Sequence, residues 1–145
     1  MRLWHQKLIP YLPRQQLLGQ HRECAALRGK GWGRKHATVN YVFQYAPNEL
    51  VAYHYLVIEE MRHRGYNPDK IWYNPKWRGT SLQEDLGWAF QQEVDYVYRS
   101  AVDNGEMIYE EHNDAYLREC INNLKSKGID TTEMEKLLCL KEFMN

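Results

Sequence analysis

The chain has 145 residues, 43% of them hydrophobic and 13% aromatic, and this size and composition predict one folded domain spanning residues 1–145. It contains no run of about 18 apolar residues, so no membrane-spanning helix is expected. Charge and proline interrupt the N-terminus before any signal-like apolar run, which predicts a cytoplasmic protein.

The formal net charge of zero hides a gradient along the chain. Residues 1–36 hold eight Lys or Arg and a single acid, Glu23, whereas residues 81–145 hold six basic and fourteen acidic side chains. A basic segment of this density can bind a polyanion through phosphate contacts, and an acidic remainder keeps the opposite surface off the same polymer. The alternative, equally open from charge alone, is a basic segment folded against acidic helices.

The predicted elements are helices. A first helix should begin with Pro13 in its first turn and run to about Arg28, where the glycines of RGKGWG end it. A second should begin near Pro47 and stop at Gly65 in a left-handed conformation. Its predicted apolar face consists of Leu50, His54, Val57, Ile58 and Met61.

The second half predicts further helices after an aromatic loop over residues 66–80, where two Asn-Pro pairs break any period. Ser81 and Glu84 read as a capping box for a third helix reaching about residue 102. A fourth is expected over residues 112–128, and a short last helix is expected where Thr132 and Glu135 can cap it. Only residues 37–45 hint at strand-like alternation. The predicted class is all-α, a compact single-domain bundle of four to five helices with long ordered loops.

Cysteines and histidines indicate neither disulfides nor a metal site. Cys24, Cys120 and Cys139 are odd in number, widely spaced and without a CxxC pair, so they are expected to be reduced, packed thiols. The six histidines are scattered without ligand spacing. His21 either lines a site on the first helix or is buried. No metal and no other cofactor is expected.

Glu23 is the residue that demands a chemical explanation. An isolated acid among cations usually forms a salt bridge, here to Arg22, Arg28 or a neighbour. The functional alternative pairs Glu23 with the α-amine of Met1, because such an amine has a pKa of roughly 7.7 to 8.0 and nearby cations lower it further. An amine nucleophile beside one carboxylate is the minimum equipment for imine chemistry at a sugar carbon.

Several short motifs carry a resemblance to a known family. MRLW at the N-terminus, QQLLGQHRE over residues 15–23, RKH over residues 34–36 and the later LVIEEMRHRGY resemble the pyrimidine-dimer DNA glycosylase family of the endonuclease V type. The resemblance covers roughly residues 1–79 and fades in the acidic C-terminal part. It implies a compact helical, cofactor-free DNA repair enzyme that excises ultraviolet photodimers and then nicks the strand as an abasic-site lyase. The implied partner is damaged double-stranded DNA. The protein is expected to be a monomer.

The resemblance also implies roles for particular residues. Arg22 and Glu23 match the catalytic Arg-Glu pair, Gln15 matches the start of the same helix, and Arg2 matches the arginine that follows the nucleophilic residue. Because the second residue is Arg2, Met1 takes the nucleophile position. Glu23 is then expected to stabilise the cationic intermediate and to assist removal of the sugar proton.

Basic and aromatic residues of the N-terminal part are the predicted DNA contacts. Trp32, flanked by glycines and cations, is the preferred candidate for a wedge that extrudes a nucleotide, although tryptophan is more often a core residue. The predicted DNA-binding residues are Arg2, Arg14, Gln15, Arg28, Lys30, Trp32, Arg34, Lys35 and His36.

Two other function classes remain open from the sequence. A helical DNA- or RNA-binding protein without catalysis would use the same basic residues, and only Met1 and Glu23 separate it from the enzyme. A module that pairs its acidic helices with a basic protein ranks third.

Overall fold

The protein's structure is a computed structural model that describes residues 2–35 and 38–144, with side chains as far as residue 138. These residues form five α-helices and three short 3-10 helices, and they contain no strand beyond an isolated bridge between Trp77 and Glu84. The predicted all-α class is confirmed. None of the described helices combines the length and apolar character needed to cross a bilayer.

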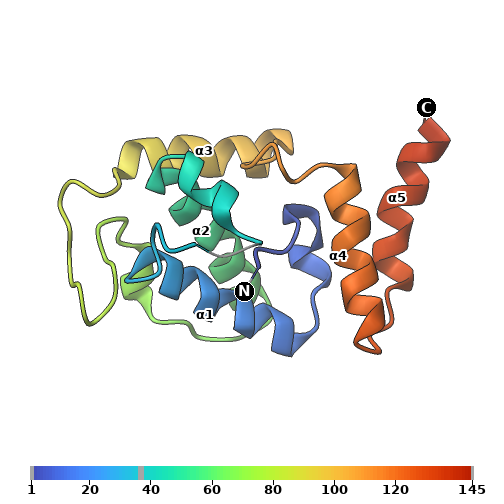
Figure 1. Ribbon diagram of the computed structural model, residues 1–145, viewed down its shortest axis with the longest axis horizontal. Coiled ribbons are helices and arrows are strands. Elements are labelled where there is room, and N and C mark those ends of the chain that lie inside the picture. Colours follow the sequence, from blue (N-terminus) through green and yellow to red (C-terminus); the bar gives the residue numbers. More distant parts are fainter. Residues whose placement is uncertain (1, 36–37, 145) are drawn as a thin grey trace.

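The first two long helices lie close to their predicted positions. α1 covers Arg14–Arg28 directly after Pro13, and α2 covers Pro47–His63 with Pro47 in its first turn. The predicted apolar face of α2 is buried along its whole length. α2 packs against both α1 and α3, and Figure 1 shows it between them.

The end of α1 is tight against a distant loop. The Gly29 N–H donates to the carbonyls of Ala25 and Ala26, both at 3.1 Å. A Cβ atom on Gly29 would lie only 2.9 Å from the Arg78 carbonyl oxygen, so no side chain fits there. Glycine therefore ends α1 where the predicted glycine signal placed the end.

The predicted start of the third helix is wrong. α3 covers Gln91–Asn104, so residues 81–90 are not helical. The proposed capping box does not form, because the Glu84 carboxylate instead accepts a hydrogen bond from the Asn74 amide at 3.1 Å. The Lys76 ammonium donates to two backbone carbonyls of this segment, at 2.8 and 3.1 Å. Tertiary contacts hold residues 81–90 as an irregular loop and override the local helix signal.

The last two helices lie side by side at one end of the molecule (Figure 1). α4 covers Asp114–Ser126, within the predicted range, and α5 covers Thr132–Met144. Thr132 begins α5 as predicted, but its hydroxyl donates to Asp130 at 2.6 Å and the Glu135 N–H bonds to the Thr131 carbonyl. The proposed Thr132–Glu135 cap is therefore not formed.

The weakly alternating segment is not a strand, and both cysteines with described side chains are buried. Asn40–Gln44 form the 3-10 helix η2 rather than a strand. Cys24 and Cys120 are buried free thiols, as expected. The side chain of Cys139 lies outside the described residues.

The N-terminal segment passes through the interior rather than along the surface. Leu3, Leu8 and Leu12 are at most 1% exposed. The Tyr116 hydroxyl of α4 donates to the Leu3 carbonyl at 2.5 Å, and the Tyr53 hydroxyl of α2 lies 2.5 Å from the Trp4 carbonyl. Helices from both halves of the sequence therefore hold residues 2–4 in place.

Candidate active site

The Glu23 carboxylate lies against the first described residue of the chain. Its Oε2 atom accepts the Arg2 backbone N–H at 3.1 Å and the Gln20 side-chain amide at 3.2 Å. Gln20 and Glu23 lie one turn apart on the same side of α1. α1 therefore presents the carboxylate directly to the N-terminal segment.

Gln20 binds the backbone of the N-terminal segment through both the nitrogen and the oxygen of its side-chain amide. Its amide nitrogen donates to the Arg2 carbonyl at 3.0 Å, and its oxygen accepts the Trp4 N–H at 2.6 Å. The Tyr53 hydroxyl lies 2.9 Å from the same oxygen. Gln20 and Tyr53 are essentially unexposed, and buried hydrogen bonds of this kind strengthen one another. Gln20 was not among the predicted site residues, although a polar residue on the buried side of α1 is a signal that could have found it.

Trp4 lies close to two cations. The Arg2 guanidinium is 5.5 Å and the Lys127 ammonium 5.4 Å from the centre of its ring, within the range of cation–π attraction. Lys127 follows the last turn of α4 and was not predicted, because no short-range pattern connects it to the N-terminus. The acidic C-terminal part thus supplies a positive charge to the site.

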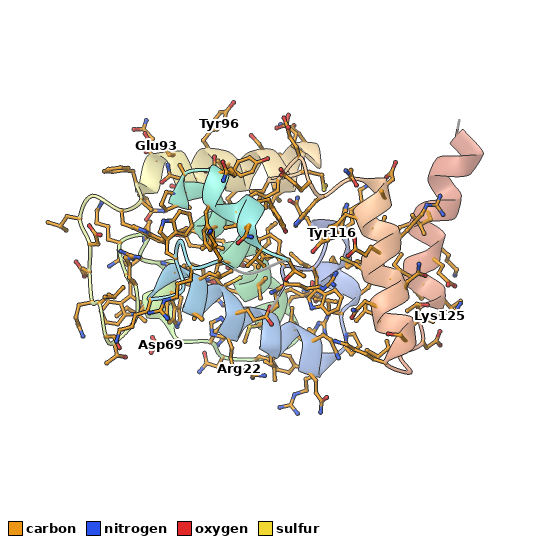
Figure 2. All side chains as sticks on the ribbon, in the orientation of Figure 1. Arg22, Asp69, Glu93, Tyr96, Tyr116 and Lys125 are labelled. Carbon is orange, nitrogen blue, oxygen red and sulfur yellow. The ribbon has the colours of Figure 1, made fainter. Side chains whose placement is uncertain are left out.

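A cavity of about 430 Å³ opens beside the carboxylate. Its volume is in the range of small-ligand sites. Arg22 is exposed on the outer face of α1, as Figure 2 shows, and its guanidinium lies over Gly19, where an added Cβ would be 3.7 Å away. The lining includes Trp4, Gln15, Gln20, Arg22, Glu23 and Lys127.

Burial raises the pKa of Glu23 above its ordinary value. The Arg2 N–H, the Gln20 amide and the positive charge of Lys127 oppose this shift because they favour the ionised form. The result is a half-buried carboxylate with a raised proton affinity. Such a group suits general acid–base work.

The predicted cations that lie on the surface are Arg14, Arg22, Lys30, Arg34 and Lys35. The first two are on α1 and the other three in the turn that follows it. Arg14 also lies over the ring of Tyr66, at 5.6 Å. Arg2 is more enclosed, because its guanidinium is 3.7 Å from the Glu119 carboxylate and 3.9 Å from the Cys120 sulfur. A phosphate would have to compete with Glu119 for Arg2.

Arg28 does not fit its predicted role in DNA binding. It is 0% exposed, and its guanidinium donates to the carbonyls of Trp72, Asn74 and Trp77 at 2.8, 2.8 and 3.1 Å. The Arg78 guanidinium in turn donates to the Arg28 and Gly29 carbonyls at 2.8 and 3.2 Å. These two arginines join the end of α1 to the loop, so Arg28 has a structural task.

The position of Trp32 does not support a wedge. It is partly buried and packs edge-on against Phe43 at 5.1 Å and Trp88 at 5.6 Å. Such pairs stabilise an aromatic cluster. Met1 and His36 lie outside the described residues. Within the described residues no group of three or more His, Cys, Asp or Glu side chains is placed to hold a metal ion.

Comparison with known proteins adds one finding. A family model described as pyrimidine dimer DNA glycosylase matches residues 1–74, just over half of the 145-residue chain. No curated protein and no solved structure matches the chain. The matched region contains Arg2, Gln20 and Glu23, which form the hydrogen bonds at the carboxylate, whereas Lys127 lies beyond it. The chain belongs to the pyrimidine dimer DNA glycosylase family.

Proposed function

We propose that this protein is a DNA N-glycosylase with abasic-site lyase activity, acting on pyrimidine photodimers through an imine formed by the α-amine of Met1. Glu23 is the essential carboxylate. The proposal rests on family membership together with the geometry at Glu23. In this proposal Arg22, the neighbouring residue on the exposed face of α1, holds a substrate phosphate.

The contact between the Arg2 N–H and Glu23 is the observation that carries this proposal. Covalent geometry limits the α-amine nitrogen of the first residue to about 4 Å from the Arg2 nitrogen, whatever its conformation. The Glu23 oxygen, 3.1 Å from the Arg2 nitrogen, therefore lies within about 7 Å of the amine nitrogen. This arrangement can bring an amine and a carboxylate to the same carbon atom, which an imine mechanism requires.

The chemistry follows from these two groups. The unprotonated amine attacks C1′, the C1′–N bond breaks, and the base leaves with the bonding electrons and takes up a proton. Opening of the sugar ring then gives a protonated imine, which the Glu23 carboxylate stabilises. Glu23 next removes a proton from C2′, and the C3′–O bond breaks by β-elimination, which cuts the strand. Each step uses general acid–base or nucleophilic catalysis available from the amine and this carboxylate.

Substrate must be extruded from the duplex before C1′ can be reached. The cavity beside Glu23 provides the space, and Arg22 and Lys127 give it a positive lining. Arg14, Lys30, Arg34 and Lys35 extend the basic surface along and beyond α1. Binding through these residues should weaken steeply with salt, because phosphate contacts release counterions.

Borohydride trapping tests the proposal. Duplexes carrying either an abasic site or a cyclobutane thymine dimer are incubated with the wild type, with Glu23→Gln, and with protein acetylated at the N-terminal amine. Glu119→Gln is the matched control, because it removes an equal charge close to Arg2 without touching Glu23. We expect wild type and Glu119→Gln to form an adduct that maps to Met1. Glu23→Gln should lose about 100-fold or more of the trapping rate, and the acetylated protein should form no adduct.

The outcomes separate the enzyme from its alternative. Salt-sensitive binding without an adduct on either duplex would contradict the enzyme proposal and favour a non-catalytic nucleic-acid-binding protein. An adduct on the abasic duplex alone would support the lyase step and contradict the choice of lesion.

A further inference from the structure

A chain of hydrogen bonds connects the buried Arg28 to the surface of α1. The Arg28 guanidinium lies 3.1 Å from Nδ1 of His54, and Nε2 of His54 lies 2.8 Å from Nδ1 of His21. Arg28 and His54 are completely buried, whereas His21 is partly exposed. The hydrogen-bond chain therefore begins in the core and ends at the surface.

The direction of these hydrogen bonds follows from the chemistry of arginine. A guanidinium can only donate, so Nδ1 of His54 must be the acceptor and Nε2 of His54 must carry the proton. That proton is donated to Nδ1 of His21, which in turn leaves the proton of neutral His21 on Nε2. Among the described residues no further hydrogen bond is made to the His21 ring. The outer end of the hydrogen-bond chain is thus an N–H group without an acceptor among the described residues.

The positive charge of Arg28 explains the direction of the hydrogen-bond chain. Burial lowers its pKa to about 10, and no described carboxylate forms an ion pair with it. Carbonyl dipoles, His54 and the Trp72 ring at 5.1 Å lie around its charge. In a buried chain each hydrogen bond polarises the next, so the positive charge makes the His21 N–H a stronger donor.

The surroundings also keep His21 neutral. Burial and the positive charges of Arg22 and Arg28 lower its pKa. The rings beside it are those of His54 on α2 and of the uncharged Trp72, which lies edge-on at 6.2 Å. Protonation of His21 would also require Nδ1 to give up the hydrogen bond from His54. His21 therefore keeps one donor and no charge near neutral pH.

The location of His21 suggests what accepts this hydrogen bond. Successive residues of a helix point about 100° apart, so His21 and Glu23 leave α1 on opposite flanks of the exposed Arg22. A DNA strand that passes Arg22 with one sugar at Glu23 would bring a neighbouring backbone phosphate to the His21 side. On the basis of the proposed function, we infer that His21 binds a DNA backbone phosphate as a neutral hydrogen-bond donor, oriented by Arg28 through His54.

The neutral character of the donor gives a sharp test. A cation that contacts a phosphate contributes about 0.9 to the slope of log K against log salt, whereas a neutral donor releases no counterion. We expect His21→Phe to weaken binding to a dimer-containing duplex about tenfold and to leave the salt slope unchanged. Arg22→Gln, the matched charged control, should weaken binding and also reduce the slope by about 0.9. His21→Gln keeps an N–H donor and should recover most of the lost affinity.

A second measurement examines the hydrogen-bond chain without DNA. Long-range ¹⁵N–¹H spectra of the wild type should show both His21 and His54 protonated at Nε2 at neutral pH. The thermal unfolding midpoint of His21→Phe provides the check that this variant is folded.

Each result supports or overturns the inference. A folded His21→Phe protein with wild-type affinity, a salt slope reduced as in Arg22→Gln, or a proton on Nδ1 of His21 would overturn it. If the wild type traps DNA normally while His21→Phe binds equally well, only this inference fails. Wild-type protein that neither binds nor traps DNA would overturn the proposed function as well.

Discussion

Glu23 and Arg28 lie on the same helix, five residues apart, yet their charges are used in opposite ways. Arg28 is enclosed and donates to three loop carbonyls and a histidine, which leaves no room for a ligand. Glu23 is only half-buried and lies beside a cavity of about 430 Å³. The charge at the end of α1 stabilises the fold, and the charge in the middle of α1 is available for chemistry. Charged residues of one basic segment therefore cannot be assigned a role until their partners are known.

The strongest test of this contrast is Arg28→Met. It leaves the carbonyls of Trp72, Asn74 and Trp77 without a donor in the interior. We expect the free energy of unfolding to fall by about 3 to 5 kcal/mol. Urea unfolding measures this change, and the exposed Arg22→Met should change stability by less than about 0.5 kcal/mol. Small and equal losses of stability in both variants would contradict a structural role for Arg28 that the exposed Arg22 does not have.

Lys127→Met examines the functional side of the comparison. Lys127 lines the cavity and favours the ionised form of Glu23, whereas Lys125 pairs with Glu135 at 3.4 Å and does not line the cavity. Removing Lys127 should reduce the salt slope of DNA binding by about 0.9. It should also raise the pKa of Glu23 further, so that trapping is lost at a higher pH as the solution is acidified. Lys125→Met is the control, and a matching shift in both variants would exclude a specific contribution from Lys127.

Glu23→Gln has the smallest expected effect on stability, and the effect has the opposite sign to that of Arg28→Met. The pKa of Glu23 is raised in the folded protein, so the fold favours its protonated form. The stabilising contribution is present below the unfolded pKa of about 4.3 and is lost as pH rises through the folded pKa. The neutral variant should therefore unfold about 2 to 4 °C higher than the wild type at neutral pH. Scanning calorimetry should show this gap closing near pH 4, and a less stable variant at neutral pH would contradict the prediction.

The sequence allowed a correct prediction where local signals and tertiary packing agree. Proline at the start, glycine at the end and a 3.6-residue apolar period located α1 and α2. The role of Glu23 as the catalytic carboxylate stays a prediction. The failures have a common cause. The capping signal at Ser81 did not start a helix, because Asn74 and Lys76 hydrogen-bond to residues of the 81–90 loop. The interior role of Arg28 depends on carbonyls 44 to 49 residues away. Lys127 reaches the site because α4 packs against the N-terminal segment, which no local pattern encodes.

The position of residues 2–6 beneath α4 has a consequence for biosynthesis. The Leu3 carbonyl is bound by Tyr116, and the Gln6 N–H donates to His112 at 3.1 Å, so residues 2–6 acquire these two contacts only after most of the chain has been made. Until then the segment that faces Glu23 can form its hydrogen bonds to Gln20 and Tyr53 but lacks those to Tyr116 and His112. Completion of the site is therefore expected to be a late event on the ribosome, and a nascent chain stalled before α4 should be less active toward abasic DNA than the full chain.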